Sequence, residues 1–209
     1  MIERRGDLGP MSVEEYLALD HTSMARHEYV DGRVYAMSVS TARHNRIVAN
    51  IHSRLRAATK YTECDAYFIE LKVRASPDHI YYPDAVVVSS DHEGDGLLVD
   101  EPCLVVEVTS PSTRRLDHTE KLDAYRGIPS LCGYLIAEQG RRHVTLHSRE
   151  PGGAWTCEVV IGTGTVSLPC IDATLTLDEV YETVEFPPRV RERVGDDTVW
   201  TGEDELRLH

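Results

Sequence analysis

Two short apolar runs constrain the fold of this chain more than any other feature. Residues 85–88 read Ala-Val-Val-Val, and residues 103–109 read Cys-Leu-Val-Val-Glu-Val-Thr. A strand with one face in water alternates between apolar and polar residues, and the apolar parts of these runs do not. We therefore expect two central strands of a sheet that is covered on both faces, as in α/β proteins.

Turn signals and apolar periodicity define the other elements. Asp31-Gly32 favours the tight turn of a β-hairpin, because both positions can adopt positive φ. Residues 41–60 carry apolar side chains along one helix face. The other expected elements are helices opened by the capping boxes at Ser12 and Thr176, a helix over 113–126, and strands over 27–30, 33–37, 67–73, 133–137, 143–148, 155–161 and 165–168.

The chain has 209 residues, which suits one well-buried α/β domain and is short for two. We expect this single domain over residues 1–186 and a charged extension over 187–209, because Pro187-Pro188 and a charge-rich remainder follow the last apolar residues. No stretch approaches the roughly 20 apolar residues that span a bilayer, and no secretory signal is recognisable. Cytoplasmic residence without a membrane partner is the expectation.

Composition argues against several kinds of site. The five cysteines are scattered and form no C-x-x-C pair, unlike a disulfide scaffold or a zinc ribbon. A net charge of −13 argues against tight, non-specific binding of duplex DNA, because basic residues that neutralise phosphates drive such binding. It does not exclude an enzyme acting on nucleic acid, since a local basic patch and bound metal ions also supply positive charge.

Two acids lie at the apolar strands. Asp84 stands at the entrance of the first run, and Glu107 is embedded in the second. A buried carboxylate is costly unless it is paired or coordinates a cation, and a divalent ion between two carboxylates offsets their repulsion. We therefore predict that Asp84 and Glu107 bind a divalent ion that prefers oxygen ligands. The alternative is that Asp84 is a turn residue and that Glu107 faces water.

A lysine on the following helix extends this pattern. Asp117, Lys121 and Tyr125 are spaced four residues apart, so they share one face of the expected helix. A lysine facing a metal site can orient the attacking water or neutralise charge that develops on a phosphate. The alternative is an exposed Asp–Lys pair, which contributes only about a few tenths of a kcal/mol.

The order of these residues resembles the Uma-type restriction endonuclease family, which belongs to the PD-(D/E)XK nuclease superfamily. The resemblance extends over residues 13–184, nearly all of the expected domain. The residues that carry it are Tyr82-Pro83-Asp84, then Leu104-Val105-Val106-Glu107-Val108-Thr109-Ser110-Pro111-Ser112, then Asp117, Lys121 and Tyr125, together with the early Glu28-Tyr29-Val30-Asp31-Gly32 and His44.

The resemblance implies a restriction-endonuclease-like core, which is a mixed β-sheet flanked by helices with additional antiparallel strands. It also implies metal-dependent phosphodiester hydrolysis, with Asp84, Glu107 and the Val108 carbonyl as metal ligands. The superfamily's lysine should stand two residues after the second acid, where this chain has Thr109. In the family the lysine has moved to the following helix, which matches Lys121.

Further residues are candidates for the same site. Glu28 could add a carboxylate, although a solvated strand residue is an equal alternative. His44 could face the site, although a lone histidine beside an apolar stripe is more often a packing residue. The remaining candidates are Thr109, Asp117 and Tyr125 near the metal, and Arg43, Arg46, Arg114 and Arg115 as phosphate contacts.

The leading hypothesis is an endonuclease that uses Mg²⁺ or Mn²⁺ and acts on nucleic acid, with DNA as the first choice. A second hypothesis is a catalytically inactive binding or regulatory module on the same scaffold, which the net acidity and Thr109 favour. A third is a structural dimerisation domain whose acids are merely solvated. Sheet edges make a homodimer reasonable under each of these hypotheses.

Overall fold

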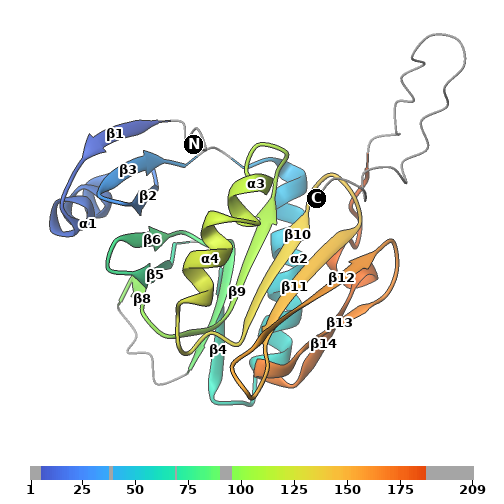
Figure 1. The fold of residues 1–209 in the computed structure, drawn as a ribbon. Coiled ribbons are helices and arrows are strands. Elements are labelled where there is room, and N and C mark those ends of the chain that lie inside the picture. Colours follow the sequence, from blue (N-terminus) through green and yellow to red (C-terminus); the bar gives the residue numbers. More distant parts are fainter. Residues whose placement is uncertain (1–5, 38–39, 69, 90–95, 187–209) are drawn as a thin grey trace, which may run out of the picture.

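The computed structural model describes residues 6–37, 40–68, 70–89 and 96–186. These residues form two mixed six-stranded sheets and a two-stranded sheet, with helices packed against them (Figure 1). The expected α/β architecture, a mixed sheet flanked by helices with additional antiparallel strands, is confirmed. The expected extension over 187–209 lies outside the described residues, as do residues 90–95 between the two apolar runs.

The central sheet contains both apolar runs. Its strand order is β12-β11-β10-β9-β7-β4, so β9 and β7 lie inside the sheet as expected. β9 pairs parallel with β10, whereas β7 and β9 pair antiparallel. The bounds are β4 (Cys64–Phe68), β7 (Ala85–Ser89), β9 (Pro102–Thr109), β10 (Gly133–Glu138), β11 (His143–Arg149) and β12 (Trp155–Ile161).

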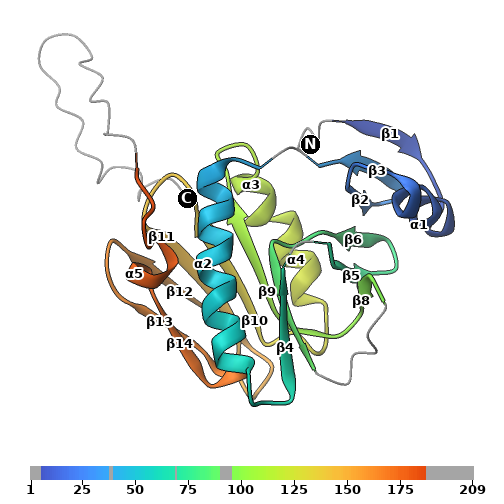
Figure 2. The same cartoon turned by 180° about the vertical axis from the view of Figure 1, so that it is seen from behind.

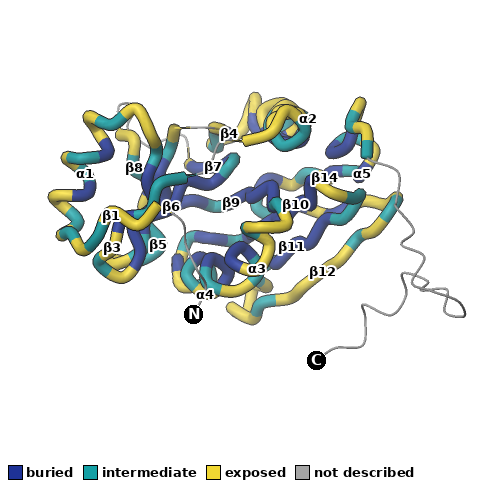
Figure 3. The backbone as a smooth tube through the Cα atoms, turned by 90° about the horizontal axis from the view of Figure 1, so that it is seen from above, coloured by how far each residue is buried: buried dark blue, intermediate teal, exposed yellow. Residues whose placement is uncertain are grey.

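Helices cover both faces of this sheet, which explains why its central strands are apolar on each side (Figure 3). The long helix α2 (Ala42–Thr59) lies on one face, as Figure 2 shows, and buries Ile47 and Ile51 against it. The short helices α3 (Arg114–Asp117) and α4 (Glu120–Arg126) lie on the other face. There Leu122 belongs to the same buried hydrophobic cluster as Val105 and Ile136 of the sheet.

The second sheet gathers the N-terminal strands and has the order β1-β3-β2-β6-β5-β8. The hairpin expected at Asp31-Gly32 is confirmed, with φ of 50° and 77° at these two residues. The capping box at Ser12 opens α1, as expected. The bounds are β1 (Asp7–Pro10), α1 (Val13–Thr22), β2 (His27–Val30), β3 (Arg33–Ala36), β5 (Lys72–Ser76), β6 (His79–Tyr81) and β8 (Leu98–Val99).

The C-terminal elements close the core on the side of α2. The capping box at Thr176 opens the short helix α5, as expected. The side-chain amide of Asn50 on α2 donates a hydrogen bond to the Val180 carbonyl at 3.1 Å, which joins the two helices. The bounds are β13 (Thr165–Leu168), the 3₁₀ helix η1 (Pro169–Ile171), β14 (Ala173–Thr176) and α5 (Leu177–Val180).

Two expected elements are wrong in their bounds. The single strand over 67–73 is divided between β4 and β5, which belong to different sheets, and Glu70 between them has φ of 80°, which a strand does not allow. The single helix over 113–126 is interrupted between α3 and α4. Thr119 leaves the helical region there, and its hydroxyl donates a 2.6 Å hydrogen bond to the Arg115 carbonyl, competing with the helix backbone.

Candidate functional site

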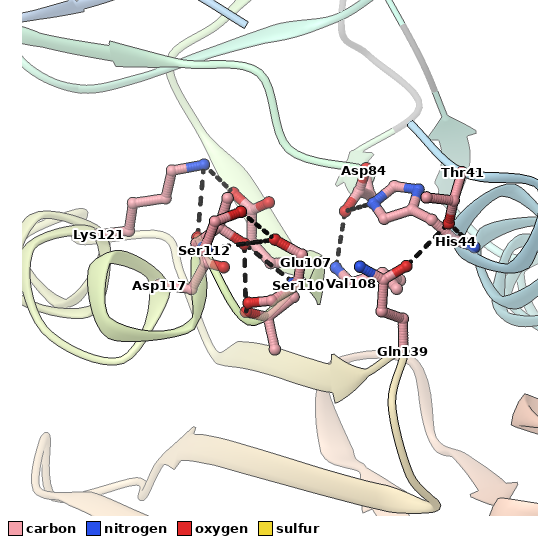
Figure 4. A network of polar contacts seen from close by, with 12 residues as sticks. Thr41, His44, Asp84, Glu107, Val108, Ser110, Ser112, Asp117, Lys121 and Gln139 are labelled. Carbon is pink, nitrogen blue, oxygen red and sulfur yellow. Dashed lines mark hydrogen bonds and ion pairs between the residues drawn. The ribbon is translucent and has the colours of Figure 1, made fainter. Parts of the chain in front are cut away.

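The two predicted acids lie beside each other near the end of β9 (Figure 4). β7 and β9 pair with Ala85 opposite Val106, so extending the register by one residue brings Asp84 next to Glu107. The backbone N–H of Asp84 donates a 3.0 Å hydrogen bond to the Val106 carbonyl, which holds this register up to the acid. The strand pairing thus brings together two residues that are 23 positions apart in the sequence.

Glu107 belongs to a buried charged cluster made with four other predicted residues. Lys121 donates a 2.8 Å hydrogen bond to its Oε1, and the Tyr125 hydroxyl approaches the same oxygen at 3.3 Å. The Lys121 ammonium also lies 2.8 Å from Glu28 Oε1 and 3.8 Å from Asp117 Oδ1. All five residues are nearly inaccessible to solvent, so the alternatives of a solvated Glu28 and an exposed Asp117–Lys121 pair are not what the structure has.

This acidic cluster, defined by Glu28, Glu107, Asp117, Lys121 and Tyr125, holds three carboxyl groups against one ammonium. Burial raises the pKa of Glu107 well above its usual value, and the charges of Asp117, Asp84 and Glu28 add to the effect while Lys121 opposes it. Burial also raises the pKa of Asp117. The cluster therefore has an excess of negative charge that protons or another cation must offset.

The same cluster keeps Lys121 charged. Burial alone would lower the pKa of the ammonium, but Glu107, Glu28 and Asp117 together raise it well above the usual value. Burial raises the pKa of the Tyr125 hydroxyl, and Glu107 raises it further, so the phenol remains a hydrogen-bond donor. The cluster thus presents one fixed positive charge and one neutral donor to Glu107.

Asp84 has different partners, on the side of α2. Its Oδ2 accepts a 2.6 Å hydrogen bond from the Val108 N–H and lies 3.2 Å from His44 Nε2. Burial disfavours a charged His44, but Asp84, together with Asn45 and the Val108 backbone, raises the pKa of this histidine above its usual value. The alternative in which His44 is only a packing residue is therefore incomplete, because its ring also faces the Asp84 carboxylate.

The carboxylates of Asp84 and Glu107 consequently point to different neighbours, one toward His44 and the other toward Lys121 (Figure 4). They still influence each other, since the charge of Asp84 raises the pKa of Glu107. Among the residues that the structure describes, no three His, Cys, Asp or Glu side chains converge to hold a metal by themselves.

The remaining predicted residues are distributed around this region. Thr109 is buried at the end of β9, where its hydroxyl donates to the Ser110 carbonyl at 3.2 Å. Arg43 and Arg46 reach the C-terminal segment, through the Glu185 carbonyl at 3.1 Å and the Thr183 hydroxyl at 3.0 Å. Arg114 lies 3.3 Å from a carboxylate on β10, whereas Arg115 is exposed.

A comparison with protein families decides what kind of chain this is. The model of the Uma2 family, described as "Putative restriction endonuclease", matches residues 13–178. The chain belongs to the Uma2 family.

Individual proteins show the same likeness. Two uncharacterized proteins from Synechocystis sp. are 27% and 23% identical to this Uma2 chain, over 84% and 73% of its length and 94% and 88% of their own. A crystal structure described as "a putative nuclease belonging to DUF820" from Anabaena variabilis superposes with a TM-score of 0.69 at 17% identity. It covers 82% of this chain and 98% of the other, and it shows that the two proteins share the fold.

Sequence reasoning missed a polar network that lies next to two of the candidate acids of this Uma2 chain, Glu28 and Asp84. Asp20 on α1 accepts a 2.9 Å hydrogen bond from Lys72, another from the Tyr82 hydroxyl, and a 3.2 Å one from the His27 N–H. His27 precedes Glu28, and Tyr82 stands two residues before Asp84, so the network holds the chain next to Glu28 and Asp84. No sequence signal connects Asp20 to Lys72 and Tyr82, because these two partners are 52 and 62 positions away along the chain.

A second missed group lies at the end of β10. The acid Glu138 follows the apolar strand expected over 133–137, just as Glu107 is embedded in an apolar run, so the same reasoning could have found it. Its neighbour Gln139 accepts a 2.9 Å hydrogen bond from the Thr41 hydroxyl, which caps the N-terminus of α2 near His44.

No helix among the described residues is long and apolar enough to cross a membrane.

Proposed function

We propose that this Uma2 protein is a metal-dependent endonuclease that hydrolyses phosphodiester bonds of nucleic acid, with DNA as its substrate. Asp84, Glu107 and the Val108 carbonyl would hold Mg²⁺ or Mn²⁺, and Lys121 would assist. The observation that carries the proposal is the buried acidic cluster beside Asp84, in which three carboxyl groups face a single ammonium. Such an arrangement is costly without a further cation.

The donor atoms fit a hard divalent ion. All three are oxygens, and Mg²⁺ is commonly bound through one or two carboxylates while it keeps several waters. The lack of a third converging side chain among the described residues is consistent with such an ion. His44 supports the same assignment, since the Asp84 carboxylate and the Val108 backbone both favour its positively charged form. The oxygens at this strand end thus already favour a neighbouring positive charge.

The bound ion would lower the pKa of a coordinated water and offset charge on the phosphate. The chain's own residues would do the rest. Lys121, kept charged by Glu107 and Glu28, would orient the attacking water or stabilise negative charge on the phosphate. Tyr125, held as a neutral phenol, would keep the Glu107 carboxylate oriented through its hydroxyl.

Replacing Asp84 with asparagine is expected to reduce metal-dependent cleavage at least about a thousandfold, because the substitution removes a ligand charge where the phosphate must be stabilised. The assay follows cleavage of labelled duplex DNA, single-stranded DNA and RNA in the presence of Mn²⁺ or Mg²⁺. The matched control is Asp65→Asn on β4, where the carboxylate is 39% exposed and pairs with Arg56. Cleavage that is equal in wild type and Asp84→Asn would remove this mechanism.

Calorimetric titration with Mn²⁺ separates the nuclease from the inactive module that shares its scaffold. An active site should bind the ion in wild type and lose it in Asp84→Asn, whereas an inactive module should show little affinity in either.

A homodimer is also part of the proposal, because β12 ends the central sheet with mostly exposed residues. Sedimentation velocity would give a monomer mass if this part is wrong.

A further inference from the structure

The strongest feature outside the acidic cluster is a group of basic residues around Glu138 at the end of β10. Arg141 binds the Glu138 carboxylate with two hydrogen bonds, from Nε at 2.7 Å and Nη2 at 3.0 Å. Arg114 Nη2 lies 3.3 Å from Glu138 Oε1, and His143 Nδ1 lies 3.2 Å from the same oxygen. The Glu138 carboxylate is thus contacted by Arg114 from α3, Arg141 from the turn between β10 and β11, and His143 from β11.

The exposure of these groups differs in a way that indicates a binding role. The Glu138 side chain is only 10% exposed, whereas Arg114 is 47% and Arg141 is 37% exposed. A buried acid that only paired with one surface arginine would not need a second arginine beside it. Here the acid anchors two guanidinium groups whose outer parts face solvent, which is a fixed arrangement suited to a phosphate oxygen.

The charge of this group is positive in a protein whose net charge is −13. Burial raises the energy of a charged Glu138, yet Arg141, His143 and Arg114 together lower the pKa of its carboxyl, so it stays ionised. Burial lowers the pKa of both His143 and His118, and Arg114 lowers it further, while Glu138 acts in the opposite direction on both histidines. The two arginines therefore outweigh the single acid even with both histidines neutral.

The group lies beside the acidic cluster on the same face of the sheet. In the parallel pairing of β9 and β10, Ile136 is opposite Glu107 and Glu138 is opposite Thr109. Residues that are two positions apart share a face and lie about 6.6 Å apart along a strand. Arg114 also stands at the start of α3, whose last residue Asp117 belongs to the acidic cluster. The arginines are therefore beside the proposed cleavage site and separate from its ligands.

We propose that Arg114 and Arg141, held in place by Glu138, bind a backbone phosphate of the nucleic acid next to the bond that is cleaved. This inference rests on the proposed function and adds the place where the substrate strand is held. Because phosphates carry no base information, the contact positions the strand without reading its sequence. Glu138 is a positioning residue, since it acts through the two arginines.

The test is binding of a fluorescein-labelled duplex and a labelled single strand, measured by fluorescence anisotropy with Ca²⁺ in place of Mg²⁺ to prevent cleavage. The double variant R114A/R141A should bind about a hundredfold more weakly, and its log–log salt dependence should be shallower by about one unit, because the contact to one phosphate is lost. The control is Arg54→Ala on α2, whose side chain is also 47% exposed and paired with an acid, and it should leave binding unchanged.

Glu138→Gln gives a second, independent readout. The substitution adds one unit of positive charge, so attraction by net charge alone would tighten binding, whereas loss of the anchor should weaken it about tenfold. Unchanged affinity of R114A/R141A, with wild type binding normally, overturns the phosphate site alone. Tighter binding by Glu138→Gln overturns its positioning role. If wild type binds neither oligonucleotide, both the site and the proposed function are wrong.

Discussion

Replacing Lys121 with methionine is expected to destabilise the folded protein by about 3–5 kcal/mol at pH 8, because the acidic cluster loses its only ammonium. Glu28, Glu107 and Asp117 would then face one another in a buried space without compensation. Methionine keeps most of the side-chain volume, so the loss reports charge more than packing. Urea-induced unfolding of the metal-free protein measures the change in free energy directly.

The destabilisation should depend on pH in a defined direction. The carboxyls of Glu107 and Asp117 have pKa values above their usual range in the folded state, and loss of Lys121 would raise them further. A group whose pKa is raised by folding contributes stability at low pH and loses it as the pH rises through the folded value. The variant should therefore be closest to wild type near pH 5 and fall below it toward pH 8.

Two controls decide whether the effect comes from the cluster. Lys60→Met changes an exposed lysine whose ammonium lies 5.1 Å from the centre of the Tyr61 ring, and it should change stability by no more than about 0.5 kcal/mol. The second control is Mn²⁺. At about a hundred times its dissociation constant, it should add about 2.7 kcal/mol to the free energy of unfolding of each variant that binds it. Lys121→Met that is as stable as wild type at pH 8 would contradict the charge assignment.

The sequence predicted the central sheet well because burial leaves a direct mark on residue type. Strands apolar on both faces, such as 85–88, cannot lie at a surface, and the capping boxes at Ser12 and Thr176 act through neighbours in the chain. The segment 67–73 was expected to be one strand because its residues are typical of strands. The sequence does not show the positive φ of Glu70, at which the chain passes from one sheet to the other. The break at Thr119 was missed because threonine is tolerated within helices.

The candidate site was predictable where the chemistry is unusual and unpredictable where the partner is distant. The sequence predicted that Lys121 shares one side of its helix with Asp117 and Tyr125. Lys121 still lies 3.8 Å from Asp117 although the helix is interrupted between α3 and α4. The orientation of Asp84 was not foreseen, since it depends on the packing of α2 and the ring of His44. The contact between Lys72 and Asp20 was not foreseen either, because the two residues are 52 positions apart and neither carries a local signal for the other.

Replacing Glu107 with glutamine is expected to separate stability from activity. At pH 8 the metal-free variant should be more stable than wild type, because a raised pKa means that the fold disfavours the charged form of this buried carboxyl. The amide has the shape of the acid, and its oxygen can still accept from Lys121 and Tyr125. Cleavage should be lost together with stabilisation by Mn²⁺, since a ligand charge is removed.

The gain from Glu107→Gln should disappear in acid, which distinguishes it from an improvement in packing. Below the usual glutamate pKa of 4.5, wild-type Glu107 is protonated in both folded and unfolded chains, so wild type and variant carry the same charge. The gain should grow as the pH rises from there through the folded pKa and then level off. Glu158→Gln on the exposed strand β12 removes one acid from the surface and should show neither change. A variant that is less stable than wild type at pH 8 would make Glu107 a structural partner of Lys121, and one that still cleaves would remove it from the metal site.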